Sequence, residues 1–122
     1  MFDVCALGEL LIDFTPVGAS AAGNIIFERN QGGAPANVLT AVTKLGGSGA
    51  FIGKVGSDQF GQFLKNVLIE NKIEAMGLKF SDKVNTTLAF VHLDDKGDRS
   101  FSFYRKPGAD TGLKRLTLNM TL

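Results

Sequence analysis

The amino-acid sequence predicts an α/β fold, in which helices cover a parallel sheet and a smaller antiparallel sheet protrudes from it. Two observations support this prediction. Strand-like and helix-like apolar patterns alternate along residues 2–80, and a hairpin pattern follows at residues 86–105. Strands that alternate with helices are joined by right-handed crossovers, so they align in parallel and the helices cover their faces.

Two segments show the one-sided apolar spacing of amphipathic helices. The first spans residues 35–45; its initial proline suits a first helical turn, and Gly46 suits the left-handed position beyond the end. The second spans residues 58–71, where either Ser57 or Asp58 can cap the N-terminus. Its apolar stripe consists of Phe60, Phe63, Leu64, Val67 and Leu68.

Short apolar runs before and after these helices predict three parallel strands. Residues 2–7 have the pattern of a strand buried on both faces, which makes Cys5 a buried and unreactive thiol. Residues 49–55 form a second run, and a weaker third run contains Leu78 and Phe80.

Two further segments, at about residues 9–31 and 86–105, do not fit this alternation and predict a lid. Residues 9–31 are too long for a simple strand-to-helix connection and carry two apolar runs around an Ala/Gly/Ser turn. Residues 86–93 and 99–105 flank a turn, and Phe101, Phe103 and Arg105 share one face of the second strand. We expect a small antiparallel sheet that can cover a ligand.

The composition is that of an ordinary globular protein and excludes several function classes. Of the 122 residues 44% are hydrophobic, and the formal net charge of +1 provides no basic surface for nucleic acid or a membrane. No stretch reaches transmembrane length, and the single cysteine excludes an internal disulfide. These features predict a cytoplasmic protein.

The segment at residues 31–37 is the strongest candidate for a ligand-binding element. Gly32 and Gly33 precede a helix, so the backbone can approach a ligand and the free N–H groups of the first turn can face it. Asn37 adds a donor and an acceptor, which suits hydroxyl groups. A tight turn without a ligand explains the same pattern equally well.

Three other side chains have both a functional and a structural interpretation. Asp13 follows the first strand, where its carboxylate could hold two neighbouring hydroxyls, although a solvent-facing position on a half-exposed strand is slightly favoured. Arg105 suits either a ligand contact beside the lid or a cross-strand ion pair. His92 has no second ligand at useful spacing, so we expect a structural role for it and no metal site.

Four motifs together resemble the N-terminal part of fructokinases in the ribokinase (PfkB) family. They are GELLIDF at residues 8–14, GGAPAN at 32–37, FIGKVGSD at 51–58 with Gly61, and FYR at 103–105 followed by PGAD at 107–110. Each motif is weak alone, but together they follow the family's order and spacing over nearly the whole chain.

The resemblance implies a ribokinase-like fold with a protruding β lid, and an ATP-dependent, Mg²⁺-using kinase that phosphorylates a primary alcohol of fructose. The pair Asp58 and Gly61 corresponds to a structural turn. Lid strands pair between subunits in many relatives, which implies a homodimer. The sugar contacts carried over from the family are Asp13, Gly32, Gly33 and Asn37, with Phe90, Phe103 and Arg105 from the lid.

Residues 1–122 correspond only to the N-terminal portion of such a domain. The family's catalytic aspartate lies in a downstream Gly-Ala-Gly-Asp motif that this sequence lacks, and the ATP-binding residues lie there too. Gly53-Lys54 does not complete a phosphate-binding loop, because Ser48 and Val55 stand at two required positions. We therefore expect a truncated chain with no catalytic residue, no tight binding of ATP and no activity in isolation.

Some features depart from the family pattern and leave alternatives open. Leu39 stands where relatives have a small residue, which is a mild packing change, and residues 116–122 alternate like a strand where relatives continue into a helix. The chain could instead be a non-catalytic folding or dimerisation module. Within the family, the substrate could be 2-keto-3-deoxygluconate, ribose or a nucleoside, although the FYR and PGAD motifs favour fructose.

Overall fold

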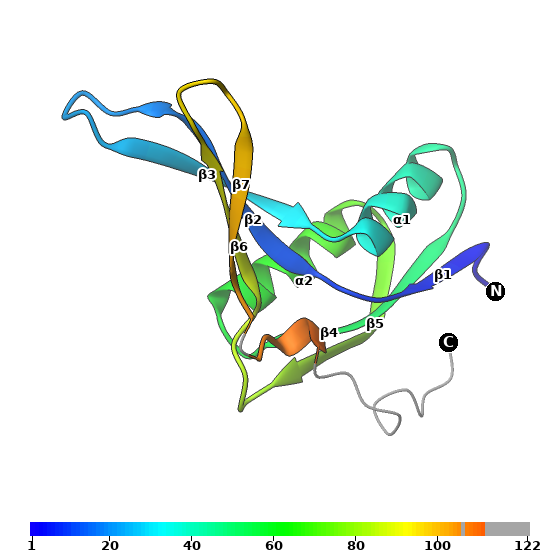
Figure 1. Cartoon of the computed structure of the whole chain (residues 1–122). Helices are drawn as coiled ribbons and strands as arrows, with labels where there is room; N and C mark the ends of the chain where they lie inside the picture. Colours follow the sequence, from blue (N-terminus) through cyan, green and yellow to red (C-terminus); the bar gives the residue numbers. More distant parts are fainter. Residues whose placement is uncertain (106, 112–122) are drawn as a thin grey trace.

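The computed structural model describes residues 1–105 and 107–111, which form two sheets and two helices (Figure 1). The first sheet has three parallel strands in the order β1-β4-β5, and the second has four in the order β3-β2-β6-β7. The parallel sheet consists of β1 (Val4–Leu7), β4 (Gly49–Gly56) and β5 (Ile73–Ser81), linked through α1 (Ala34–Lys44) and α2 (Gln59–Glu70). The lid sheet consists of β2 (Leu11–Ala19), β3 (Ile25–Gly32), β6 (Leu88–Leu93) and β7 (Arg99–Tyr104), and a short 3-10 turn, η1 (Ala109–Thr111), follows. The predicted α/β class is confirmed, whereas the strand-like pattern at residues 116–122 lies outside the described residues.

Both helices pack on the same face of the parallel sheet and form one core with it. Leu39 of α1 and Leu64 of α2 are fully buried against Phe51 of β4 in a single apolar cluster. Leu39 also occupies the space that a side chain at position 49 would need, since a Cβ there would lie 2.9 Å from its Cδ2. The larger residue at position 39 is therefore accommodated by a glycine on the neighbouring strand.

The prediction that β1 is buried on both faces is wrong. Its residues alternate between half-buried and exposed, so Cys5 is exposed and Leu7 keeps 54% of its surface accessible. Val4 and Ala6 point toward the core cluster. Successive strand side chains face opposite sides, and among the described residues helices cover only one side of this sheet.

Local capping explains where the helices begin and end. The N–H of Gly46, whose φ is 89°, donates to the Thr43 carbonyl, and the N–H of Gly47 donates to Val42, which together form a Schellman motif after α1. Asp58 caps α2 by accepting the N–H of Gly61 at 2.7 Å. The predicted left-handed glycine and the aspartate cap are both confirmed.

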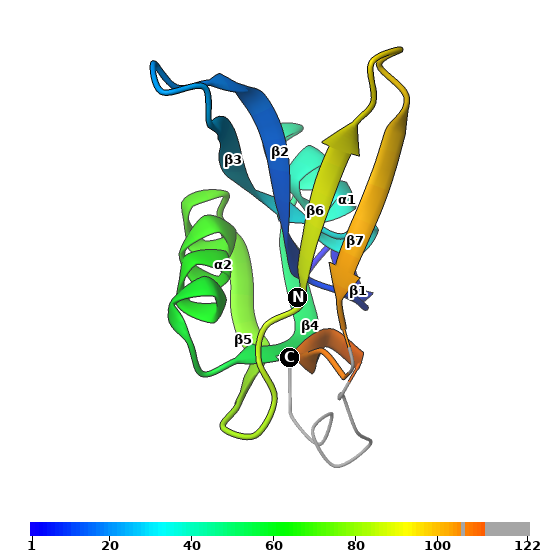
Figure 2. The ribbon, with the colours of Figure 1, turned by 60° about the vertical axis from the view of Figure 1, so that its left-hand side comes forward.

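The lid sheet protrudes from the body of the molecule as two hairpins that lie side by side (Figures 1 and 2). Its outer pairs, β2–β3 and β6–β7, are antiparallel as predicted, but the central pair β2–β6 is parallel. The sheet is therefore mixed, because β2 and β6 both leave the body in the same direction. The sequence pattern indicated each hairpin but not how the two are joined.

An aromatic cluster connects the lid to α2. Phe14 of β2 stacks on Phe90 of β6 with ring centroids 4.6 Å apart, and it meets Phe60 of α2 edge-on at 5.9 Å. Phe27 and Tyr104 contact Phe90 edge-on from the two outer strands. Every strand of the lid thus contributes to one cluster, which stabilises the lid's position on the body.

Candidate functional site

The junction between β3 and α1 is built from two glycines that leave no room for side chains. Gly33 has a φ of 110°, and a Cβ there would lie 2.5 Å from the Glu9 carbonyl oxygen. This close approach lets the connection between β1 and β2 run directly against the start of α1. The backbone of both segments is therefore fixed around the same point.

The carboxylate of Asp13 lies over the neighbouring Gly32. The two residues are on adjacent strands, and a Cβ at position 32 would stand 2.4 Å from Asp13 Oδ2. Partial burial of the carboxylate raises the pKa of Asp13, and the negative charge of Glu9 raises it further. A partly buried acid with a raised pKa, and with no ion pair among the described residues, is a candidate for a functional group.

Asn37 lies in the first turn of α1, next to the same glycine pair. Its N–H donates to the Gly33 carbonyl at 3.3 Å, and its side-chain oxygen accepts a hydrogen bond from Gln31 Nε2 at 3.3 Å. The structure thus brings Asp13, Gly32, Gly33 and Asn37 to one junction, where Asp13 lies against Gly32 and Asn37 is hydrogen-bonded to Gly33.

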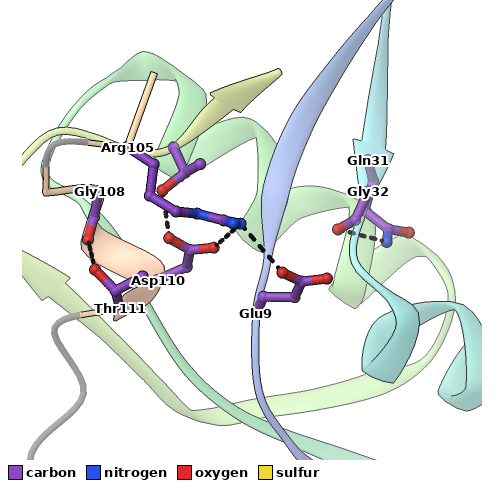
Figure 3. Close-up of polar contacts among 8 residues, drawn as sticks. Glu9, Gln31, Gly32, Arg105, Gly108, Asp110 and Thr111 are labelled. Carbon is purple, nitrogen blue, oxygen red and sulfur yellow. Dashed lines mark hydrogen bonds and ion pairs between the residues drawn. The ribbon is translucent and has the colours of Figure 1, made fainter. Parts of the chain in front are cut away.

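Arg105 forms the polar base of the lid together with two acids (Figure 3). One of its terminal nitrogens lies 2.7 Å from Asp110 Oδ2 and 3.1 Å from Glu9 Oε2. The Asp110 side chain is only 1% exposed, and its other oxygen accepts a hydrogen bond from the Thr87 hydroxyl. Burial lowers the pKa of the Arg105 guanidinium, but bonding to Asp110 and the charge of Glu9 outweigh this and raise it overall. The structure shows Arg105 in ion pairs, but neither acid lies on a strand paired with β7, so these are not the predicted cross-strand pair.

Glu9 and Asp110 belong to this site but were not among the predicted site residues. Both occur inside the motifs that carry the family resemblance, at the second residue of GELLIDF and the last of PGAD. Their place inside these motifs was the signal that could have identified them as site residues. Glu9 is separated from Arg105 by 96 positions in the chain, so no local pattern could pair them.

The two predicted lid aromatics lie on opposite faces of the lid sheet. Asp13, Ala89 and Phe103 are directly paired across β2, β6 and β7, so they share one face. Phe90 is the neighbour of Ala89, and its ring joins the aromatic cluster on the other face. Phe103 is 50% exposed on the same face as Asp13, with the Arg105 guanidinium 5.4 Å from its ring centroid. Within one copy of the chain, the geometry therefore brings Phe103 and Arg105 toward the Asp13 face but not Phe90.

The described residues contain neither a P-loop nor a cluster of metal-ligating side chains. Gly53 and Lys54 lie inside β4 rather than in a loop before a helix, so they cannot cradle a phosphate as a P-loop does. Across residues 1–105 and 107–111, no group of three or more His, Cys, Asp or Glu side chains could hold a metal. No helix in this part of the chain is long and apolar enough to cross a bilayer.

Comparison with known sequences gives one family over nearly the whole chain. The profile of the family described as pfkB family carbohydrate kinase matches residues 1–120. The chain is 49% identical over 121 residues to a protein named probable fructokinase-5 of Arabidopsis thaliana. The match covers 98% of this chain but 37% of that relative, so the chain spans a little over a third of its length.

Solved structures give the same result for the fold. The chain superposes with a TM-score of 0.86 on a fructokinase from Xylella fastidiosa with bound ATP, at 39% identity, covering 96% of this chain and 37% of that one. It also matches a fructokinase from Vibrio cholerae O395 in a fructose-, ADP- and calcium-bound form, with a TM-score of 0.81 and 35% identity, covering 97% of this chain and 37% of that one. The two-sheet arrangement described above is therefore shared with these enzymes.

Proposed function

Because the chain belongs to the pfkB family of carbohydrate kinases, we propose that it forms the sugar-binding and lid portion of an ATP-dependent kinase that phosphorylates a primary alcohol of fructose. The observation that carries this proposal is the Asp13 carboxylate, held over Gly32 at the start of α1 and not neutralised by any ion pair among the described residues. A carboxylate in this position can accept hydrogen bonds from two adjacent hydroxyl groups.

The other residues of the junction have complementary roles in this proposal. The missing side chain at Gly32 leaves room for the Asp13 carboxylate, the one at Gly33 leaves room for the Glu9 backbone, and Asn37 supplies a further polar contact. Phe103 and Arg105 border the same face of the lid, where an aromatic ring can cover the apolar side of a sugar. Phe90 lies on the other face of the lid sheet, so it would contact a sugar only if that face were turned toward the sugar.

The chemical step is assigned to parts of the protein outside these residues. Phosphoryl transfer needs a positioned base and stabilisation of the developing negative charge, and the resemblance places the residues for both outside residues 1–122. We therefore expect the 122-residue chain to show no ATP-dependent turnover on its own. The proposal includes a cytoplasmic location, which the single cysteine favours.

A homodimer through the lid is also part of the proposal. The lid exposes large apolar side chains on both hairpins, including Ile25 at 66% and Phe101 at 52%. Exposed apolar side chains that cluster on a protruding element are typical of a surface that a partner covers. A second copy of the chain is the partner that the family resemblance favours.

The test is fructose binding to the 122-residue chain, followed by chemical-shift changes in its ¹H–¹⁵N NMR spectrum. Fructose should shift the backbone resonances of Gly32 and Gly33, and Asp13→Ala should weaken binding by about tenfold or more. Asp13→Asn serves as the folding control. Because the charged form of Asp13 lowers the stability of the fold, this neutral variant should be at least as stable as the wild type at pH 7.

Matched controls separate this proposal from its alternatives. Asp82→Asn removes an exposed acid outside the site and should leave fructose binding unchanged. Ribose, 2-keto-3-deoxygluconate and a nucleoside are titrated in parallel, and tighter binding of one of them would reassign the substrate. Unchanged fructose affinity in Asp13→Ala would remove Asp13 from the site, and absence of binding by any of these ligands would favour the non-catalytic module.

A further inference from the structure

The side-chain nitrogen of Gln31 donates to two acceptors at the junction between β3 and α1. Its Nε2 donates to the Gly32 carbonyl at 3.3 Å and to Asn37 Oδ1 at 3.3 Å. Figure 3 shows the first of these bonds, with the Gln31 amide turned onto the adjacent Gly32. Gln31 is thus the only side chain in the described part of the chain that hydrogen-bonds to the Asn37 amide.

These two bonds determine which way both amides face. A backbone carbonyl can only accept, so the atom of Gln31 that meets Gly32 must be the nitrogen. The same nitrogen then meets Asn37, and only the oxygen of that amide can accept from it. An Asn side chain can otherwise rotate to exchange its oxygen and nitrogen, so its orientation is set by its hydrogen-bond network.

We propose that Gln31 is a positioning residue that orients the Asn37 amide, so that Asn37 presents its Nδ2 group as a hydrogen-bond donor to the sugar. The inference rests on the proposed sugar-binding function and specifies that Asn37 is the donor in its contact with the sugar. No described residue accepts a hydrogen bond from Asn37 Nδ2. That donor is therefore available to a ligand.

This orientation makes the two polar side chains of the junction complementary. The Asp13 carboxylate only accepts hydrogen bonds when it is ionised, whereas Asn37 in this orientation donates. A hydroxyl group that donates to Asp13 can accept from a group such as Asn37 Nδ2 at the same time. The pair thus favours a ligand with hydroxyl groups over one that offers only donors or only acceptors.

The first experiment follows the Asn37 side-chain amide by ¹H–¹⁵N NMR in the sugar-free chain. In Gln31→Glu the new carboxylate can only accept, so the Asn37 amide should rotate and donate to it, moving one Nδ2 proton resonance downfield. Gln31→Leu should leave both Nδ2 protons near their wild-type positions, since they have no protein partner to lose. Unchanged Nδ2 resonances in Gln31→Glu would overturn the inference without any sugar present.

The second experiment is a double-mutant cycle on fructose affinity in the same chain. Gln31→Glu should weaken fructose binding about five- to tenfold, because the rotated amide offers an acceptor where the sugar needs a donor. In an Asn37→Ala background, the same change at position 31 should have almost no further effect. Additive losses would show that Gln31 acts independently of Asn37, and would overturn the inference.

The two experiments distinguish failure of the inference from failure of the proposed function. If the wild-type chain binds fructose, and Asn37→Ala weakens binding while Gln31→Glu does not, the function stands and the inference fails. If the wild-type chain binds no fructose, the proposed function fails. The amide resonances of Gln31→Glu still decide in that case whether Gln31 orients Asn37.

Discussion

At the scale of single residues, two aspartates with opposite environments illustrate what a carboxylate does in this chain. Asp13 has a raised pKa, because it is partly buried and lies near the negative charge of Glu9. Burial also raises the pKa of Asp58, but hydrogen bonds from Thr86, Gly61 and Phe60 outweigh it and hold that pKa below its usual value. Charged Asp13 therefore lowers the stability of the folded chain, whereas charged Asp58 raises it.

Asp58 should therefore account for part of the chain's loss of stability in acid. It accepts the Gly61 N–H at 2.7 Å, and the hydroxyl and N–H of Thr86 at 2.7 and 2.9 Å. Removing these bonds in Asp58→Ala should lower the free energy of unfolding by about 2–3 kcal/mol at pH 7. Urea unfolding measures this difference.

The pH dependence follows from the sign of the shift. Because the folded-state pKa of Asp58 is lowered, its stabilisation is present above the unfolded-state pKa, near 3.8, and is lost as the pH falls through the folded value. The stability difference between the wild type and Asp58→Ala should therefore shrink below about pH 4. A difference that stays constant down to pH 2 would contradict the assignment.

At the scale of elements, the packing of α2 on β4 depends on the absence of one side chain. Gly61 lies in the first part of α2, and a Cβ there would stand 2.1 Å from the Gly56 carbonyl oxygen. The helix can approach the strand closely only because this side chain is missing. The same closeness lets Asp58 reach Thr86, two residues before β6 begins.

Gly61→Ala should destabilise the chain although alanine is the better helix former. Helix propensity alone favours alanine by about 1 kcal/mol, but the added Cβ collides with backbone that cannot rotate away. We expect a net loss of about 2 kcal/mol or more in the free energy of unfolding, measured by thermal or urea unfolding. Gln59→Ala, at an exposed position of the same turn, should change stability by less than about 0.5 kcal/mol. Equal or higher stability of Gly61→Ala would refute this packing.

At the scale of the whole molecule, the lid is the part least covered by the rest of the described chain. Its aromatic cluster on one face packs against α2 through Phe60, and Arg29 of β3 lies 3.9 Å from the ring centroid of Phe63 on the same helix. The outer parts of both hairpins protrude beyond the helices (Figure 2). The lid's base is therefore held firmly, while its apolar tips are available for contact.

The 122-residue chain should consequently self-associate through the lid. Ile25→Lys adds a charge to an exposed apolar position of β3 and should shift the chain toward monomer, because burying an unpaired ammonium group is unfavourable. Light scattering coupled to size-exclusion chromatography measures the mass. Val38→Lys, at a comparably exposed position of α1, is the control and should leave the mass unchanged. A monodisperse wild-type monomer at all concentrations would rule out the lid dimer for this chain.

Much of the fold could be predicted, because it depends on patterns that lie within short stretches of the chain. The apolar stripe of α2, the glycine after α1 and the hairpin β6–β7 were each indicated by neighbouring residues. The exposed Cys5 and the mixed lid sheet were not, because they depend on which elements cover β1 and on how two hairpins meet.

The sequence by itself determined the alternation of strands and helices, the glycine pair before α1, and the family to which the chain belongs. These properties reside in periodicity, in backbone freedom at Gly32 and Gly33, and in motif order, all of which are local. Only the tertiary structure decided that Asp13 lies over Gly32, that Phe90 and Phe103 face opposite sides, and that Arg105 meets Glu9 and Asp110. These arrangements arise from packing between elements, which no short pattern encodes, and some of the residues they join, such as Arg105 and Glu9, lie far apart in the chain.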